Sequence, residues 1–125
     1  VLMAADAARA DPRWWWNDVR VTNNAGASVT PHLAPIRYNS NVAQLFNTIF
    51  VTWSDETDGG GDTEIWFTAS FNGGCSFCPP MRITDNDVDD TRPRIAIIVT
   101  PAGMFSLAIA FESNGQAVIA WDSWP

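Results

Sequence analysis

The amino-acid sequence predicts an all-β protein made of two copies of one sheet unit. Seven Trp and seven Phe among 125 residues are a heavy aromatic load, and aromatic side chains suit the half-buried surface of a pleated strand. Eight Gly and eight Pro separate short apolar runs, and no stretch repeats its apolar residues at the 3.6-residue period of a helix. Hydrophobic residues make up 46% of the chain and charged residues 17%, which is typical of a folded globular protein.

The two copies are related by a shift of 62 residues. The segment Val-Arg-Val-Thr-Asn-Asn at 19–24 resembles Met-Arg-Ile-Thr-Asp-Asn at 81–86. Six identical pairs occur between positions 20 and 36: Arg20/Arg82, Thr22/Thr84, Asn24/Asn86, Pro31/Pro93, Ala34/Ala96 and Ile36/Ile98. Residues 50–55 match residues 118–123 at a larger shift of 68, which we interpret as a loop insertion. The copies then span about residues 1–62 and 63–125 of a single β domain.

Each copy contains short strands at regular spacing. We expect strands at residues 49–53, 65–69, 106–111 and 117–121. The run at 106–111 alternates strictly, with Leu107, Ile109 and Phe111 on one face and Ser and Ala residues on the other. A strand with large side chains on one face and small side chains on the other predicts a sheet that packs between two neighbouring sheets.

The charge of the chain excludes some classes of partner. The net charge is −7, with seven Arg and no Lys. A nucleic-acid binder needs a basic surface to neutralise phosphates, so we expect no nucleic-acid partner. No apolar run approaches the roughly 20 residues that a membrane-spanning helix needs, so we expect no membrane insertion.

The segment 70–77, Ser-Phe-Asn-Gly-Gly-Cys-Ser-Phe, resembles the Asp-box, the Ser-x-Asp-x-Gly-x-Thr-Trp hairpin of sialidases and related β-propellers. Ser70 and Gly74 match that pattern, Asn72 stands in place of the Asp, and Phe77 stands in place of the Trp. The short polar side chain of Asn72 can bond the backbone of the turn, and Gly74 permits a positive φ. Phe77 is expected to anchor the hairpin in the sheet.

This resemblance to the Asp-box (BNR-repeat) sialidase-like propellers implies two antiparallel four-stranded blades. It also implies a secreted or cell-surface protein that acts on or binds carbohydrate. The Asp-box is a structural hairpin distant from the active site in this family, so it transfers no catalytic residue to this chain.

The two blades lie in a shifted frame, because the chain begins about where it stops within the repeat. Two blades cannot close a ring and would leave strand edges exposed. We therefore expect self-association, with a trimer of six blades favoured, or completion of the ring by further chain.

Carboxylates gather in two loops, which hold nine of the fourteen acidic residues. The members are Asp55, Glu56, Asp58, Asp62 and Glu64 in one loop and Asp85, Asp87, Asp89 and Asp90 in the other. Hard cations need several oxygen ligands, so a calcium site is one interpretation, with Asp58 and Asp62 as the better ligands. Solvated turn residues are the alternative.

Three adjacent tryptophans, Trp14, Trp15 and Trp16, cannot all be buried on one face of a strand. At least one is expected to line an interface or a groove, where aromatic rings also stack on sugars. Cys75 and Cys78 form either a local disulfide or two buried thiols. The single histidine, His32, is expected to be structural.

These observations favour a non-catalytic module for carbohydrate binding or structural assembly. The alternative is a fragment of a secreted sialidase-type glycoside hydrolase. Such an enzyme needs several convergent arginines and a tyrosine nucleophile, and the one tyrosine, Tyr38, is adjacent to Arg37 without the arginine motif of the family.

Overall fold

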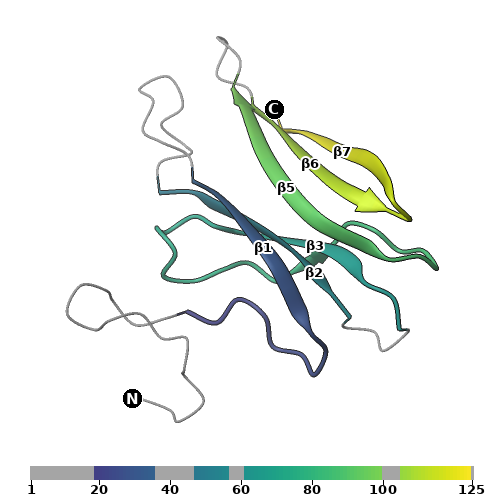
Figure 1. The fold of residues 1–125 in the computed structure, drawn as a ribbon. Helices are drawn as coiled ribbons and strands as arrows, with labels where there is room; N and C mark the ends of the chain where they lie inside the picture. The colour runs from purple at the N-terminus through teal and green to yellow at the C-terminus, as the bar shows by residue number, and fades with distance from the viewer. Residues whose placement is uncertain (1–18, 36–46, 57–60, 100–104, 125) are drawn as a thin grey trace.

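A computed structural model of the chain describes residues 19–35, 47–56, 61–99 and 105–124. These residues form seven strands in two antiparallel sheets (Figure 1). The prediction of an all-β fold is confirmed. The described residues contain no helix, and therefore none that is long and apolar enough to cross a membrane.

The first sheet has four strands in the order β1-β2-β3-β4. These are β1 (Ser28–Pro35), β2 (Ile49–Asp55), β3 (Glu64–Ser70) and β4 (Met81–Arg82). The second sheet has three strands in the order β5-β6-β7, where the sequence predicted four. These are β5 (Asp90–Val99), β6 (Phe105–Ser113) and β7 (Gln116–Trp124). Asn114 and Gly115, which join β6 to β7, both have positive φ (47° and 77°), as a two-residue hairpin turn requires.

The same backbone irregularity occurs in β1 and β5, 62 residues apart. Pairing of β1 with β2 shifts register between Val29 and His32, and pairing of β5 with β6 shifts between Thr91 and Arg94. The residue inside each irregularity has a positive φ, 50° at Thr30 and 54° at Arg92, and a proline follows each one. A positive φ is uncommon for a residue other than glycine. Its recurrence makes β5 the counterpart of β1.

Strand pairing corrects the second part of the sequence alignment. Ser28 at the start of β1 pairs with Asp55 of β2, and Asp90 at the start of β5 pairs with Ser113 of β6. The counterpart of β2 is therefore β6, and the counterpart of β3 is β7. Aligning residues 50–55 with residues 118–123 was therefore wrong. Both segments contain an apolar run that ends in Trp, at Trp53 and at Trp121, and this local pattern does not distinguish one strand of the unit from another.

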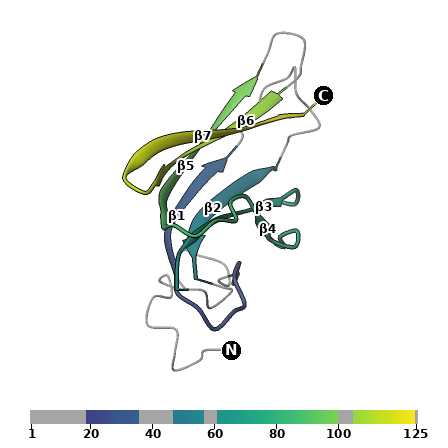
Figure 2. The ribbon, with the colours of Figure 1, turned by 90° about the vertical axis from the view of Figure 1, so that its right-hand side faces the viewer.

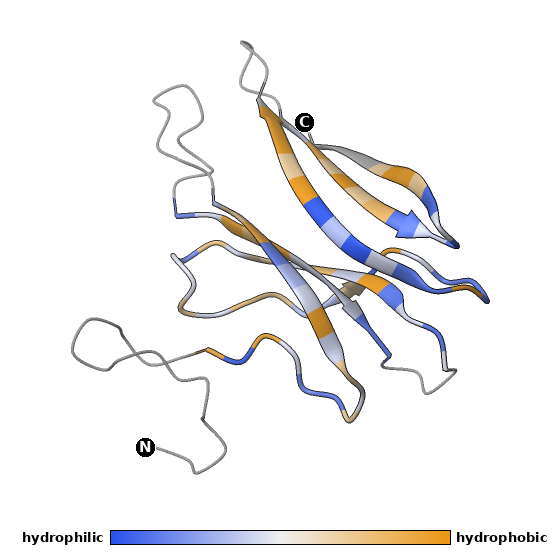
Figure 3. Cartoon of the chain, in the orientation of Figure 1, coloured by the Kyte–Doolittle hydropathy of each residue, from blue (hydrophilic) through white to orange (hydrophobic). Residues whose placement is uncertain are grey.

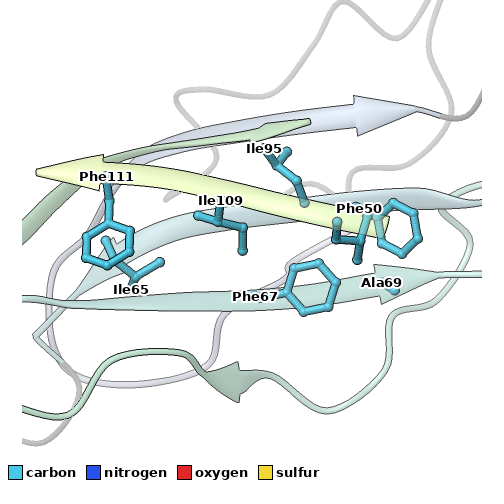
Figure 4. Packing of buried hydrophobic residues seen from close by; sticks show 8 residues of the cluster. Phe50, Ile65, Phe67, Ala69, Ile95, Ile109 and Phe111 are labelled. Atoms are coloured by element: carbon cyan, nitrogen blue, oxygen red, sulfur yellow. The ribbon is translucent and has the colours of Figure 1, made fainter. Parts of the chain in front are cut away.

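One hydrophobic core lies between the two sheets. Its buried members are Phe50, Ile65, Phe67 and Ala69 from the first sheet and Ile95, Leu107, Ile109 and Phe111 from the second. The side chains labelled in Figure 4, which are all of these except Leu107, point into the space between the sheets. The rings of Phe50 and Phe67 stack with their centroids 5.7 Å apart. Burial of such side chains contributes about 1.5–3 kcal/mol each, so this core is the main stabilising element of the fold.

Strand β5 lies over β1 and β2 and reaches β3, which brings one sheet onto the other (Figures 1 and 2). The half of β5 nearer its C-terminus is hydrophobic and its N-terminal half is hydrophilic (Figure 3). His32 supplies a polar link between the sheets, since the Ile95 N–H donates a hydrogen bond to its Nδ1 at 3.2 Å. This agrees with a structural role for the single histidine.

The two sheets meet through faces that are not counterparts in the repeat. Phe67 of β3 pairs with Thr52, and Ile119 of β7 pairs with Ala110, so Ile119 is the counterpart of Phe67. Phe67 is 8% exposed in the core, whereas Ile119 is 53% exposed on the far face of the second sheet. Conversely, buried Ile95 of β5 has as its counterpart Leu33 of β1, which is 52% exposed. The sheets are therefore stacked head to tail.

Candidate functional site

An open pocket of about 700 Å³ lies at one end of the two-sheet stack. Three segments form it: the turn before β3, the segment before β5, and the β6–β7 turn. Its lining residues are Gly61, Asp62, Asp87, Val88, Asp89, Thr91, Asn114 and Gly115. In Figure 1 these segments lie at the right-hand end of the sheets, where β3 and β5 begin.

Hydrogen bonds hold the three segments together. The Asp90 N–H donates to the Thr63 carbonyl at 2.7 Å, and the Asn114 N–H donates to the Asp89 carbonyl at 3.3 Å. The Asp89 carboxylate accepts from the Thr63 N–H at 3.0 Å and from the Thr63 hydroxyl at 3.3 Å. The walls of the pocket are thereby fixed by backbone groups rather than by long side chains.

The pocket is polar and acidic. It brings Asp62 from the first acidic loop together with Asp87 and Asp89 from the second, beside the Asn114 amide. Carboxylates accept hydrogen bonds and an amide both donates and accepts, so this lining suits a ligand with several hydroxyl groups. Among the described residues, no group of three His, Cys, Asp or Glu side chains is arranged to hold a metal ion. Asp58 lies outside the described residues, so a calcium site at Asp58 and Asp62 stays a prediction.

Three of the clustered acids are buried, so they are not solvated turn residues. Asp55, Glu64 and Asp90 are at most 1% exposed. Asp55 Oδ2 accepts hydrogen bonds from Asn24 Nδ2 at 3.1 Å and Trp53 Nε1 at 2.9 Å. It also accepts one from the Ser28 hydroxyl.

Both carboxylate oxygens of Glu64 accept hydrogen bonds. Its Oε1 accepts from Arg82 Nη2 at 2.9 Å and from the Asn86 N–H at 2.8 Å, and its Oε2 accepts from the Thr84 hydroxyl. Thr84 in turn accepts from the Ile65 N–H at 2.9 Å. A buried carboxylate with this many donors ties the segment after β4 to the start of β3. That segment then leads directly into the pocket wall.

The hairpin at residues 70–77 is closed by side-chain hydrogen bonds. Ser70 Oγ accepts from the Gly74 N–H at 2.9 Å and from the Asn72 N–H at 3.4 Å. Asn72 Oδ1 accepts from the Ser76 N–H at 3.0 Å. Gly74 has a φ of 91°, and Phe77 is half-buried. Ser70 and Asn72 thus satisfy backbone donors that a tight turn leaves without partners.

The remaining predicted site residues lie apart from the pocket or outside the described residues. Cys75 and Cys78 are both free and exposed, which contradicts the interpretation as buried thiols. A disulfide between them stays a prediction, because exposed thiols at this spacing can still be oxidised. Trp14, Trp15 and Trp16 lie outside the described residues.

The buried bonding of Glu64 and Asp55 was not found by sequence reasoning. A repeated signal was present, since Arg-x-Thr-x-Asn occurs at residues 20–24 and again at 82–86. In both copies the arginine Nε donates to the threonine carbonyl, at 2.6 Å in the first and 2.8 Å in the second. A basic and two polar residues repeated together indicate a shared hydrogen-bonding role.

Comparison of the chain with protein-family models, with curated proteins and with solved structures finds no match. We therefore infer the function from the geometry of the sheets and of the pocket.

Proposed function

We propose that this chain is a non-catalytic module of the β-propeller type, that its two sheets are neighbouring blades of a ring completed by further copies, and that its end pocket binds carbohydrate. The observation that carries this proposal is the head-to-tail stacking of the sheets. A sandwich closed on itself has no further face to offer, whereas head-to-tail stacking leaves a face at each end that matches the next unit.

The exposed apolar residues support this assembly. Ile98 and Ile119 on the far face of the second sheet are 45% and 53% exposed, and smaller alanines surround them. Large exposed side chains on a sheet face mark an interaction surface. Phe67, the counterpart of Ile119 in the first sheet, already packs against the second sheet, so a further copy of the same unit is the partner that fits. Three chains would complete the six blades that the resemblance to Asp-box propellers implies.

Carbohydrate binding is assigned to the acidic pocket. Its carboxylates and its amide offer paired hydrogen-bonding groups to the neighbouring hydroxyls of a sugar ring. The alternative as a sialidase-type hydrolase is less well supported, because the described residues that line the pocket include neither arginine nor tyrosine. A retaining mechanism on a carboxylate sugar would need both.

Native mass spectrometry tests the assembly. The proposal expects a defined multiple of the 13.7 kDa chain, with three chains favoured. A chain that remains monomeric up to high micromolar concentration would refute the ring.

A titration with monosaccharides, followed through the amide NMR signals of Asn114 and Thr91, tests the pocket. Binding is expected to move these signals and to weaken severalfold in Asp62→Asn. The matched control is Asp85→Asn, because the Asp85 side chain is 84% exposed, pairs with Arg82 and does not line the pocket. Equal effects of the two substitutions, or no shift with any sugar, would refute the assignment.

A further inference from the structure

Within the described part of the chain, the second sheet has three strands and no counterpart of the fourth strand of the first sheet. In the first sheet, β4 pairs with the outer edge of β3, with Trp66 opposite Arg82 and Phe67 opposite Met81. The counterpart of β3 is β7, which is an edge strand of the described second sheet. Its residues Val118 and Ile119, the counterparts of Trp66 and Phe67, are 38% and 53% exposed. An edge strand presents unpaired backbone groups that can pair with another strand.

The same chain carries a segment that matches β4 and belongs to no sheet. Val19 and Arg20 are the counterparts of Met81 and Arg82 in the 62-residue repeat, and neither is in a strand. Arg20 already has the local geometry of Arg82, since each donates from Nε to the carbonyl two residues on. Arg20 makes no ion pair with any described residue, whereas Arg82 pairs with buried Glu64 at 2.9 Å.

This segment cannot reach β7 of its own chain. It continues into residues that are tied to the first sheet, where the Glu56 N–H donates to the Ala27 carbonyl at 3.1 Å and Asn24 bonds Asp55. Residues 19–22 and β7 lie at opposite ends of the two-sheet stack (Figures 1 and 2).

We propose that Val19 and Arg20 of one copy add to the free edge of β7 in the next copy as its fourth strand. The inference rests on the proposed ring and specifies the contact that closes it. The register follows from the first sheet: Arg20 lies opposite Val118, and Val19 lies opposite Ile119. The Val21 N–H then donates to the Ala117 carbonyl, as the Ile83 N–H donates to the Ile65 carbonyl at 2.7 Å. Main-chain pairing of this kind supplies affinity, and the side chains supply the register.

Gln116 occupies the place of Glu64 at this contact. Asp55 pairs with Glu64 in the first sheet, and Ser113 pairs with Gln116 in the second. Arg20 therefore meets the amide oxygen of Gln116, where Arg82 meets a carboxylate. An arginine binds a carboxylate more strongly than an amide, so the charge at position 116 controls the strength of the contact.

The test measures the association constant of the full chain by sedimentation while the charge at this contact is changed. Gln116→Glu is expected to raise it by roughly threefold to tenfold, and Gln116→Lys and Arg20→Glu are each expected to lower it by a similar factor. Arg20→Glu combined with Gln116→Lys restores the association. Asn47→Asp is the matched control, because it adds the same charge as Gln116→Glu at an exposed position just before β2, a strand that pairs with β1 and β3 and not with β7.

Cross-linking tests the register independently of charge. In a chain with Cys75→Ser and Cys78→Ser, adding Val19→Cys and Ile119→Cys is expected to give a disulfide between copies, because opposed residues bring their Cβ atoms within bonding reach. The shifted pair Val21→Cys and Ile119→Cys is expected to cross-link far less.

Different outcomes separate this contact from the ring itself. If the chain forms a multimer, its association constant does not change with the charge at position 116, and the cysteines at positions 19 and 119 form no cross-link, then the contact is refuted and the ring is not. A disulfide within one chain also refutes the contact. A monomer refutes both proposals.

Discussion

Removing the Glu64 carboxylate is expected to destabilise the fold far more than removing an exposed carboxylate partner. Glu64 is 1% exposed and accepts hydrogen bonds from Arg82, Thr84 and the Asn86 N–H. Substitution by alanine removes the buried acceptor of the Thr84 hydroxyl and of the Asn86 N–H, and it leaves Arg82 paired with the exposed Asp85 in place of a buried carboxylate. Breaking a buried pair by removing one partner costs about 3–5 kcal/mol, so Glu64→Ala is expected to lower the free energy of unfolding by that amount.

A conservative substitution of Glu64 separates the effect of its charge from the effect of its size. Glu64→Gln keeps the size of the side chain and one acceptor oxygen, so we expect a loss of about 1–3 kcal/mol, between wild type and Glu64→Ala. The comparison variant is Arg92→Ala, which removes the ion pair with Glu112. The side chains of Arg92 and Glu112 are 68% and 45% exposed, and Arg92 Nη1 lies 2.7 Å from Glu112 Oε2. An exposed pair contributes less than about 1 kcal/mol.

Urea unfolding followed by tryptophan fluorescence at one protein concentration measures all three variants. The free energy in water comes from linear extrapolation. If Glu64→Ala and Arg92→Ala lower the free energy equally, and by less than about 1 kcal/mol, the Glu64 carboxylate is not held by the buried bonds described above.

Three further substitutions test other parts of the fold by the same assay. Ser70→Ala leaves two hairpin N–H groups without an acceptor and is expected to lower the free energy of unfolding by about 1–3 kcal/mol. The control, Asn23→Ala at an exposed position, is expected to change it by less than about 0.5 kcal/mol. Equal effects of the two substitutions would contradict the hairpin bonding. Phe50→Ala opens a cavity between the sheets and is expected to cost about 3–5 kcal/mol, and a loss below about 1 kcal/mol would mean that the core is not packed as described. His32→Ala leaves the Ile95 N–H without its acceptor and is expected to cost about 1–3 kcal/mol. In that variant the Ile95 amide should exchange with solvent faster, and unchanged exchange would argue against the link between the sheets.

The fold class was predictable because it depends on local patterns. Alternation at 106–111 and short apolar runs between glycines and prolines identify strands wherever they occur in a chain. The repeat was also visible, because residues 20–36 and 82–98 share identical residues at fixed positions. The irregularity at Thr30 and Arg92 falls inside that matched segment.

Strand pairing was less predictable, since it joins residues far apart in the chain. Several apolar runs had similar patterns, and the run at 118–123 was matched to the wrong strand for that reason. Only the ladder from β5 to β6 distinguishes β6 from β7 as the counterpart of β2.

The candidate site, too, was predictable only in part from the sequence. Asp62, Asp87 and Asp89 were singled out from the sequence as acids in two loops, yet nothing local says that the two loops meet the β6–β7 turn at one pocket. Asp55, Glu64 and Asp90 come from the same acidic loops and are buried instead. Each of these acids begins or ends a strand, and burial depends on which donors the neighbouring strands bring to it.

Composition and local pattern alone thus establish an acidic, all-β chain with an internal repeat, because charge and strand periodicity are properties of the residues themselves. The head-to-tail stacking of the sheets, the separation of buried from exposed carboxylates, and the free edge of β7 emerge only when distant strands pair, because each depends on contacts between residues that the chain order keeps apart.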